Sequence, residues 1–350
     1  MSSPFYFDSD NVNVMDRFRD ALARGSDIEA MMALSLVSAI TVIPLTLIRK
    51  PYCFSVGYGM SVGMMYLTIL AVFDYNFDCF FRREGSCKLS LLSATTMLAW
   101  TGALHGFRLA AFLLFRELSV LNMRSQTKVM DKYSRISVVP LAVFLSIFYA
   151  IEVSPVLFAH RCQINGSSSS SAAAVDGGGS SPSSSTIVEN LGYMFVVLAL
   201  IGLVIESVTD YQKWIIKYRR KVKYGEKTFV SPTGGFYTIC RHPNFLGEIV
   251  VWTGLFLGSA LSFRDNLTAW VLGVLGWSGI FVIMTGSAKR LDVKHEERYR
   301  GQLEYEEWKN RVKSSFYPGF PHWREQYPVS HPSSIDDHPT LIKEDANLRR

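Results

Sequence analysis

Long uncharged segments alternate with short polar segments along most of the chain. Three uncharged runs, at residues 30–48, 51–73 and 266–288, each have about the 20 residues that a helix needs to cross a bilayer. Four shorter apolar runs reach a similar length with their flanks: 89–104 continuing to 115, 136–151, 191–205 and 249–263. The pattern predicts an all-α fold, a polytopic membrane bundle of about seven transmembrane helices.

The charges between the predicted spans predict how the bundle is oriented. Cations concentrate in the loops after the first, third and fifth spans: Arg49 and Lys50; Arg116, Arg124, Lys128, Lys132 and Arg135; and the dense cluster within 213–241. By the positive-inside rule these loops and the C-terminus are cytoplasmic. We expect a multi-pass protein of the endoplasmic reticulum, although no signal in the sequence separates this membrane from other endomembranes.

The same pattern divides the chain into five segments. Residues 1–29 are acidic and polar, so the first apolar run is expected to be an uncleaved anchor. The first four spans fall within 30–160 and the last three within 189–317. Between them, 161–188 is rich in Ser, Gly and Ala and is expected to be a disordered loop, because it has little apolar surface to bury. The tail at 318–350 is expected to be flexible.

Composition supports the membrane interpretation. Hydrophobic residues make up 49% of the chain and charged residues only 19%, whereas soluble domains have about a quarter. The mean hydropathy is +0.16. A soluble enzyme is therefore disfavoured. The net charge of +6 is explained by the basic cytoplasmic loops, so it does not require nucleic acid as a partner.

The five cysteines form no metal-ligand spacing and no disulfide framework, so no metal site is predicted. Cys79 and Cys87 share a predicted lumenal loop, where a disulfide is one alternative. Cys240 is interpreted as a small buried residue rather than a nucleophile, because no base stands at a recognisable spacing from it.

Polar side chains gather at the cytoplasmic ends of the last three predicted spans. Such residues are costly at membrane depth and are functional candidates for that reason. The first group lies on one helical face, since its members are three or four residues apart: Glu206, Asp210, Lys213, Lys217 and Arg220. The alternative is a solvated face in contact with lipid headgroups.

The second group occupies residues 234–248. Pro243 suits the first turn of a helix, so the sixth span should begin there, and its amide dipoles beside Arg241 and His242 form a candidate phosphate site. Asn244 and Glu248 are four residues apart on the same face. A buried Glu needs a partner, which a ligand hydroxyl, amide or ribose would supply. The alternative is a purely structural helix cap.

The third group follows the last predicted span, from Lys289 to Tyr299. Dense mixed charge is typical of a solvated helix, and we interpret its Lys and Glu residues in that way. His295 and Tyr299 are again four residues apart, and this pair suits a nucleotide ligand better.

These motifs resemble those of a known family. The run Asp210-Tyr211-Gln212-Lys213 after Glu206, the RHPNFLGE run at 241–248 and Thr285-Gly286 are similar to the steroid 5-alpha-reductase C-terminal and DUF1295 group of membrane reductases. The similarity covers roughly 190–320 and is weaker around 100–116. Arg-His-Pro also occurs in membrane methyltransferases of related fold, such as isoprenylcysteine carboxyl methyltransferase.

The resemblance implies that 189–317 is a cofactor-binding region that encloses NADPH. The residues that it implies for the cofactor are Asp210, Arg241, Asn244, Glu248, His295 and Tyr299. The implied reaction passes a hydride to the β-carbon of an enone in a steroid-like or other lipid substrate, while a protein acid polarises the carbonyl.

The sequence departs from the steroid reductases in the residues that hold the substrate. Those enzymes place a Glu in the second span and a Tyr in the third, and neither is present here. We predict His105 as the catalytic donor, with Tyr66 as the second candidate. The alternative is that His105 makes an interhelical hydrogen bond.

Two other functions stay open at this point. The Glu296-Glu297 doublet is similar to the acidic pair of the methyltransferases, which would make the cofactor S-adenosylmethionine and the substrate a lipid or prenylcysteine. The third possibility is a non-catalytic lipid-binding membrane protein that retains the site. The sequence does not identify a protein partner.

Overall fold

The computed structural model describes residues 14–73, 93–119, 136–173, 183–224, 229, 231–263 and 266–315. These residues form helices and connecting segments without a β-strand in the described ranges, which confirms the all-α prediction. The Cys79–Cys87 pair and the tail at 318–350 lie outside the described residues.

Six of the described helices are long and apolar enough to cross a membrane: α2 (Asp27–Ile48), α3 (Val56–Phe73), α5 (Ala94–Ser119), α7 (Val139–Ala173), α8 (Ser183–Tyr224) and α10 (Leu267–Tyr299). The seventh predicted span is α9 (Pro243–Ala260), which begins at Pro243 as predicted. It is not among the six because Asn244 and Glu248 lower the hydropathy of its first two turns. The shorter elements are α1 (Val14–Ala23), α11 (Leu303–Arg311) and the 3₁₀ helices η1 (Lys50–Phe54), η2 (Ile136–Val138) and η3 (Gly235–Thr238).

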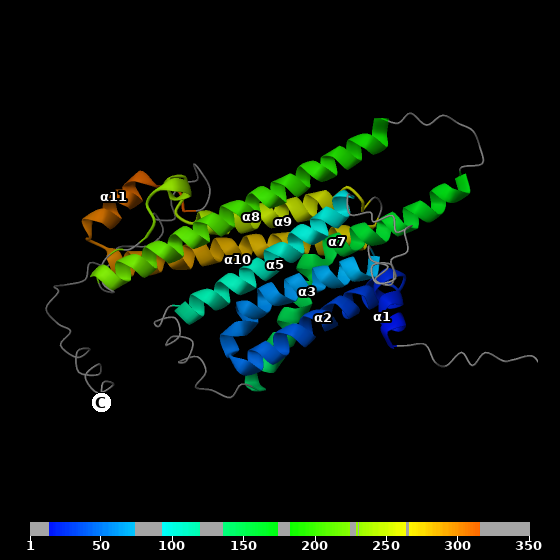
Figure 1. The fold of residues 1–350 in the computed structure, drawn as a ribbon, viewed down its shortest axis with the longest axis horizontal. Coiled ribbons are helices and arrows are strands. Elements are labelled where there is room, and N and C mark those ends of the chain that lie inside the picture. Colours follow the sequence, from blue (N-terminus) through cyan, green and yellow to red (C-terminus); the bar gives the residue numbers. More distant parts are fainter. Residues whose placement is uncertain are drawn as a thin grey trace, which may run out of the picture.

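The long helices run back and forth along the long axis of the molecule (Figure 1). One half of the bundle contains α2, α3, α5 and α7, and the other contains α8 and α10 with α9 packed against both. The C-terminal ends of α8 and α10 lie at the same end as α11, whereas α1 lies at the opposite end. Which end faces the cytoplasm stays a prediction.

Glycine allows two pairs of helices to approach closely, and this approach brings the polar residues together. A Cβ atom on Gly106 of α5 would lie 2.5 Å from the backbone nitrogen of Gly63 in α3. A Cβ atom on Gly202 of α8 would lie 2.6 Å from the backbone nitrogen of Val251 in α9. Small residues commonly mediate such contacts between membrane helices. His105 and Glu206 stand next to these two contacts, so both side chains are held between helices.

The helix ends differ from the predicted segment boundaries. Within the segment predicted to be a disordered loop, 161–188, α7 continues to Ala173 and α8 already begins at Ser183. The continuation at Arg161 is anchored, because its guanidinium donates to the carbonyl of Gly25. The predicted polar segment 1–29 likewise contains α1 and the start of α2, where Ser26 and Glu29 form a capping box.

Candidate functional site

A buried charged group lies between α5 and α8. The Nδ1 atom of His105 is 3.2 Å from Oε2 of Glu206, and Arg108 forms ion pairs with both Glu206 and Asp210. The Arg108–Asp210 distance is 3.1 Å. Glu206 is only 2% exposed and His105 is fully buried. The two acids are therefore held by partners on another helix, which is the arrangement that buried charges require.

A second buried group adjoins the first and joins α3, α7 and α9. Tyr58 donates a hydrogen bond to Oε1 of Glu248 at 3.3 Å, and its ring packs against Tyr149 with centroids 4.9 Å apart. The carboxyl of Glu152, only 2% exposed, lies within electrostatic range of Tyr58 and Glu248. Glu248 in turn lies within electrostatic range of Glu206, Asp210 and Arg108. We call these two groups together the interior cluster.

Several buried polar atoms in and beside the interior cluster have no hydrogen-bond partner among the described residues. They are Nε2 of His105, the hydroxyl of Tyr66, both carboxyl oxygens of Glu152, Oδ1 of Asn244 and Nε1 of Trp252. Nearly all buried polar atoms in proteins have a partner, and leaving one without is costly. These atoms are therefore candidates for contact with a polar ligand group.

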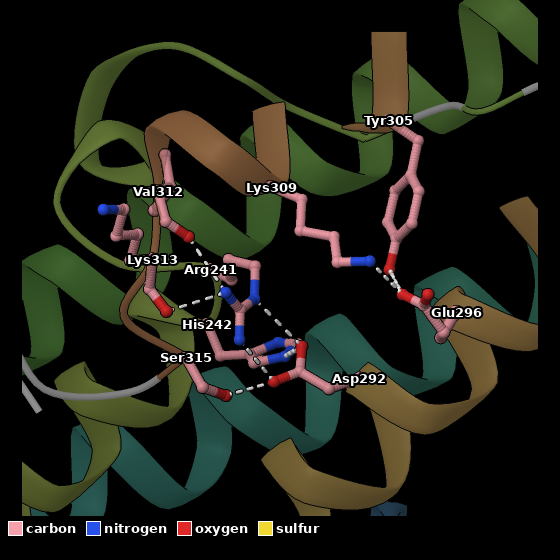
Figure 2. A network of polar contacts seen from close by, with 9 residues as sticks. All are labelled: Arg241, His242, Asp292, Glu296, Tyr305, Lys309, Val312, Lys313 and Ser315. Carbon is pink, nitrogen blue, oxygen red and sulfur yellow. Dashed lines mark hydrogen bonds and ion pairs between the residues drawn. The ribbon is translucent and has the colours of Figure 1, made fainter. Parts of the chain in front are cut away.

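A different polar group closes one end of the bundle (Figure 2). Asp292 of α10 receives hydrogen bonds from Arg241 Nε at 3.2 Å and Nη2 at 2.8 Å, from His242 Nε2 at 2.9 Å, and from the Ser315 hydroxyl. Arg241 Nη1 also donates to the carbonyls of Val312 and Lys313, at 2.9 and 3.0 Å. We call this group the end cluster; its hydrogen bonds attach the segment after α11 to the start of α9.

Glu296 and Tyr299 in the adjoining part of α10 contact α11. Glu296 accepts hydrogen bonds from the Tyr305 hydroxyl at 2.9 Å and from Lys309, as Figure 2 shows. Tyr299 is 8% exposed and packs with Phe229, Tyr305, Trp308 and Val312. Glu296 therefore connects α10 to α11, and the methyltransferase alternative stays open.

Several cations gather between the two clusters. Lys217 lies within electrostatic range of Lys213, Arg116, Lys294 and Arg298. In the described part of the chain, no acid forms an ion pair with Lys213, Lys217 or Arg116. The Lys213 ammonium instead lies 5.9 Å from the centroid of the Phe245 ring. Cations from α5, α8 and α10 at one place form a region suited to an anion.

Burial also sets the protonation of groups outside the spans. It raises the pKa of Cys240 to about 11, so the thiol stays protonated and is a poor nucleophile, in agreement with its interpretation as a buried residue. Burial lowers the pKa of His242 below its ordinary value of 6.5, although the hydrogen bond to Asp292 opposes the shift. His242 therefore favours the neutral form at the end of the bundle.

The predicted site residues separate into these two regions. His105, Asp210 and Glu248 belong to the interior cluster, and Tyr66 and Asn244 have unpaired polar atoms beside it. Arg241 lies in the end cluster, where Asp292 and backbone carbonyls occupy its donors. His295 lies next to it, with its ring 6.2 Å from that of His242 and 5.7 Å from that of Tyr299. The individual roles of these residues stay predictions.

Glu152 was missed by the sequence analysis. It directly follows the apolar run 136–151, so its charge marked the end of a span instead of a candidate inside one. In the structure it lies within the span Ile136–Ile164. A single acid followed by more apolar residues, Val153 to Ala159, was the available signal.

Fold and site together define a polytopic α-helical membrane protein with a polar site built from several helices. A family model described as "Protein of unknown function (DUF1295)" matches residues 84–312, more than half of the chain. The chain belongs to this family. The comparisons found no matching curated protein and no matching solved structure.

Proposed function

We propose that this protein is an NADPH-dependent reductase of a C=C bond conjugated to a carbonyl in a steroid-like or other lipid substrate. The chemistry rests on the similarity to steroid 5-alpha-reductases. The observation that carries the proposal is the set of unpaired, buried polar atoms beside the interior cluster, since they need a polar ligand that reaches deep between the helices. The reaction converts the enone, NADPH and a proton into the saturated ketone and NADP⁺.

The described residues fit such a cofactor. NADPH supplies the hydride when bound. The unpaired Oδ1 of Asn244 and the carboxyl groups of Asp210 and Glu248 are acceptors for the amide and ribose hydroxyls of a dinucleotide. Lys213 and Lys217, with Arg116, are donors for its phosphates, because none of them forms an ion pair with an acid among the described residues.

The proposal gives Arg241 a different role from the phosphate contact expected of it. Four of its five N–H donors already have protein acceptors. Arg241 therefore positions the start of α9, which carries Asn244 and Glu248. His295 and Tyr299 stay candidates at the edge of the phosphate region, where the His295 ring has an unpaired Nδ1.

The proposed location follows from the same arrangement. The cations that would bind the phosphates lie near the C-terminal ends of α5, α8 and α10, at the end of the bundle that the positive-inside rule makes cytoplasmic. A cytoplasmic nucleotide would reach them from that side. We therefore propose a membrane of the endoplasmic reticulum with this end in the cytoplasm.

The test is ligand-induced stabilisation of the purified protein in detergent. A ligand that binds the folded state raises its stability in a saturable way. NADPH should do so and S-adenosylmethionine should not. Lys213→Ala with Lys217→Ala should weaken NADPH binding about tenfold, an effect of about 1.4 kcal/mol.

The matched control removes two exposed cations at the other end of the bundle, Arg17→Ala with Arg19→Ala, and should leave NADPH binding unchanged. Stabilisation by S-adenosylmethionine alone would instead select a methyltransferase. Binding of lipid without stabilisation by either cofactor would select the non-catalytic lipid-binding protein.

A further inference from the structure

Glu152 is the buried acid that the cofactor region does not use. It lies about midway along the span Ile136–Ile164 and is only 2% exposed. Neither of its carboxyl oxygens has a hydrogen-bond partner in the described part of the chain, and no cation there forms an ion pair with it. Acids at this depth in a membrane protein are rare and usually mark a functional or ligand-binding site.

Two tyrosines of α3 stand beside this acid. Tyr66 is fully buried, lies within electrostatic range of Glu152, and has a hydroxyl without a partner among the described residues. Tyr58 lies on the other side, with its hydroxyl proton directed to Glu248. The Tyr58 proton is therefore already engaged, while Tyr66 keeps a donor available.

The surroundings of this group are apolar. Val62, Met65 and Ile69 of α3 and Val153 and Val156 of α7 are buried in one core cluster. A hydrophobic molecule with a single oxygen suits these surroundings. Its apolar part would contact the apolar side chains, and its oxygen would accept hydrogen bonds from the available donors. An ionised carboxylate with no cation would be far more costly there than the neutral acid.

We propose that Glu152, as a neutral acid, binds the carbonyl oxygen of the lipid substrate together with the hydroxyl of Tyr66. This inference rests on the proposed function for the identity of the substrate. When hydride adds to the β-carbon, the π electrons of the enone move onto the carbonyl oxygen, and these two donors stabilise the resulting charge. Glu152 transfers no atom in this step.

The same geometry gives His105 another role. Its Nδ1 is held by Glu206, which also pairs with Arg108, and its ring meets the edge of Trp252 with centroids 5.9 Å apart. His105 thus belongs to the charged side of the interior cluster, next to Asp210. We assign it to positioning Glu206 and Arg108 near the cofactor region.

Infrared difference spectroscopy tests the inference without requiring the cofactor. A neutral Glu152 has the carbonyl stretching band of a protonated carboxylic acid. This band should be present in the purified protein, absent from Glu152→Gln, and shifted when cholest-4-en-3-one is added as the probe. The control is Ser146→Ala, a buried residue of α7 whose hydroxyl donates to the carbonyl of Ala142 in the same helix, and it should keep the band and the shift.

Turnover of the same probe with NADPH gives a second measurement. Glu152→Gln should lower kcat about 100-fold while stabilisation by NADPH stays within twofold. If Glu152→Gln does not fold, Tyr66→Phe should still reduce the shift of the Glu152 band and lower kcat about tenfold.

The outcomes separate this inference from the proposed function. Stabilisation by NADPH with a missing or unresponsive Glu152 band overturns the inference alone. A responsive band in a protein that NADPH does not stabilise overturns the reductase proposal and leaves Glu152 as a lipid-binding residue. If both responses are absent, both are overturned.

Discussion

The interior cluster and the end cluster contain the same kinds of side chain but differ in how completely these are paired. In the end cluster, Asp292 has four donors and Arg241 gives four hydrogen bonds, while Nδ1 of His242 has no partner among the described residues. In and beside the interior cluster, Glu152, Tyr66 and Asn244 have buried polar atoms without partners in the described residues. Burial alone therefore does not identify a functional residue in this protein. Burial without a partner is the better guide.

The two clusters also differ in what surrounds them. The end cluster draws on backbone carbonyls of the segment after α11, which are available because this segment is not helical. The interior cluster lies between helices whose backbone groups already bond mostly within each helix, so its charged side chains pair with other side chains or with a ligand. This difference predicts opposite results when acids of the two clusters are changed.

The largest expected effect is on stability, from Asp292→Ala in the end cluster. The change leaves the buried guanidinium of Arg241 without its carboxylate and removes the acceptor of His242. Breaking such a pair should lower the free energy of unfolding by about 3 kcal/mol, measured by denaturation in mixed micelles. Glu297→Ala, an exposed acid on the same helix, is the control and should change it by less than about 0.5 kcal/mol.

A stable Asp292→Ala protein with lost NADPH binding would contradict this comparison, because it would make the end cluster a ligand site. The expected variant instead binds NADPH with nearly unchanged affinity under conditions where it remains folded.

In the interior cluster, Glu248→Gln should have the opposite effect: NADPH binding should weaken while stability is retained. This change keeps the shape of the side chain and an acceptor for Tyr58, so the fold should be retained. It replaces one carboxyl oxygen, an acceptor in the proposed cofactor site, with an amide nitrogen that cannot accept, and a buried hydrogen bond lost in this way costs about 2 kcal/mol. NADPH affinity should therefore fall by between about 10- and 100-fold, measured by titration of the stabilisation.

The control for this variant is Ser259→Ala, which removes a buried hydroxyl of α9 that bonds only to Leu255 of its own helix. It should leave NADPH affinity unchanged. Unchanged affinity in Glu248→Gln as well would exclude Glu248 from the cofactor site.

The spans were predictable from the sequence because hydropathy alone places a helix in a bilayer. The six long apolar helices and the start of α9 at Pro243 follow from composition and from the fixed φ of proline. The basic ends of α2, α5, α8 and α10 also lie at one end of the bundle, as the loop charges predicted.

The pairing of side chains was not predictable in the same way. Arg241 and Asp292 are 51 residues apart, and their contact depends on how α10 is rotated about its axis. The apolar pattern does not specify this rotation, because both the lipid and the core accept the same residues. For that reason Arg241 was expected to bind phosphate, and Glu152 was treated as the end of a span.

The smallest expected effect is a pH dependence in the end cluster. Burial lowers the pKa of His242 from its ordinary value of 6.5, against the opposing effect of Asp292. The folded protein therefore takes up a proton at this ring less readily than the unfolded chain does. The contribution of His242 to stability is present above pH 6.5 and is lost as the pH falls through the lowered pKa. His242→Gln keeps a donor for Asp292 but does not titrate. Unfolding measured between about pH 7.5 and pH 5, a range that includes the ordinary pKa of histidine, should therefore depend less on pH than in the unmodified protein. An equal or steeper dependence in His242→Gln would show that another group of the end cluster controls its response to acid.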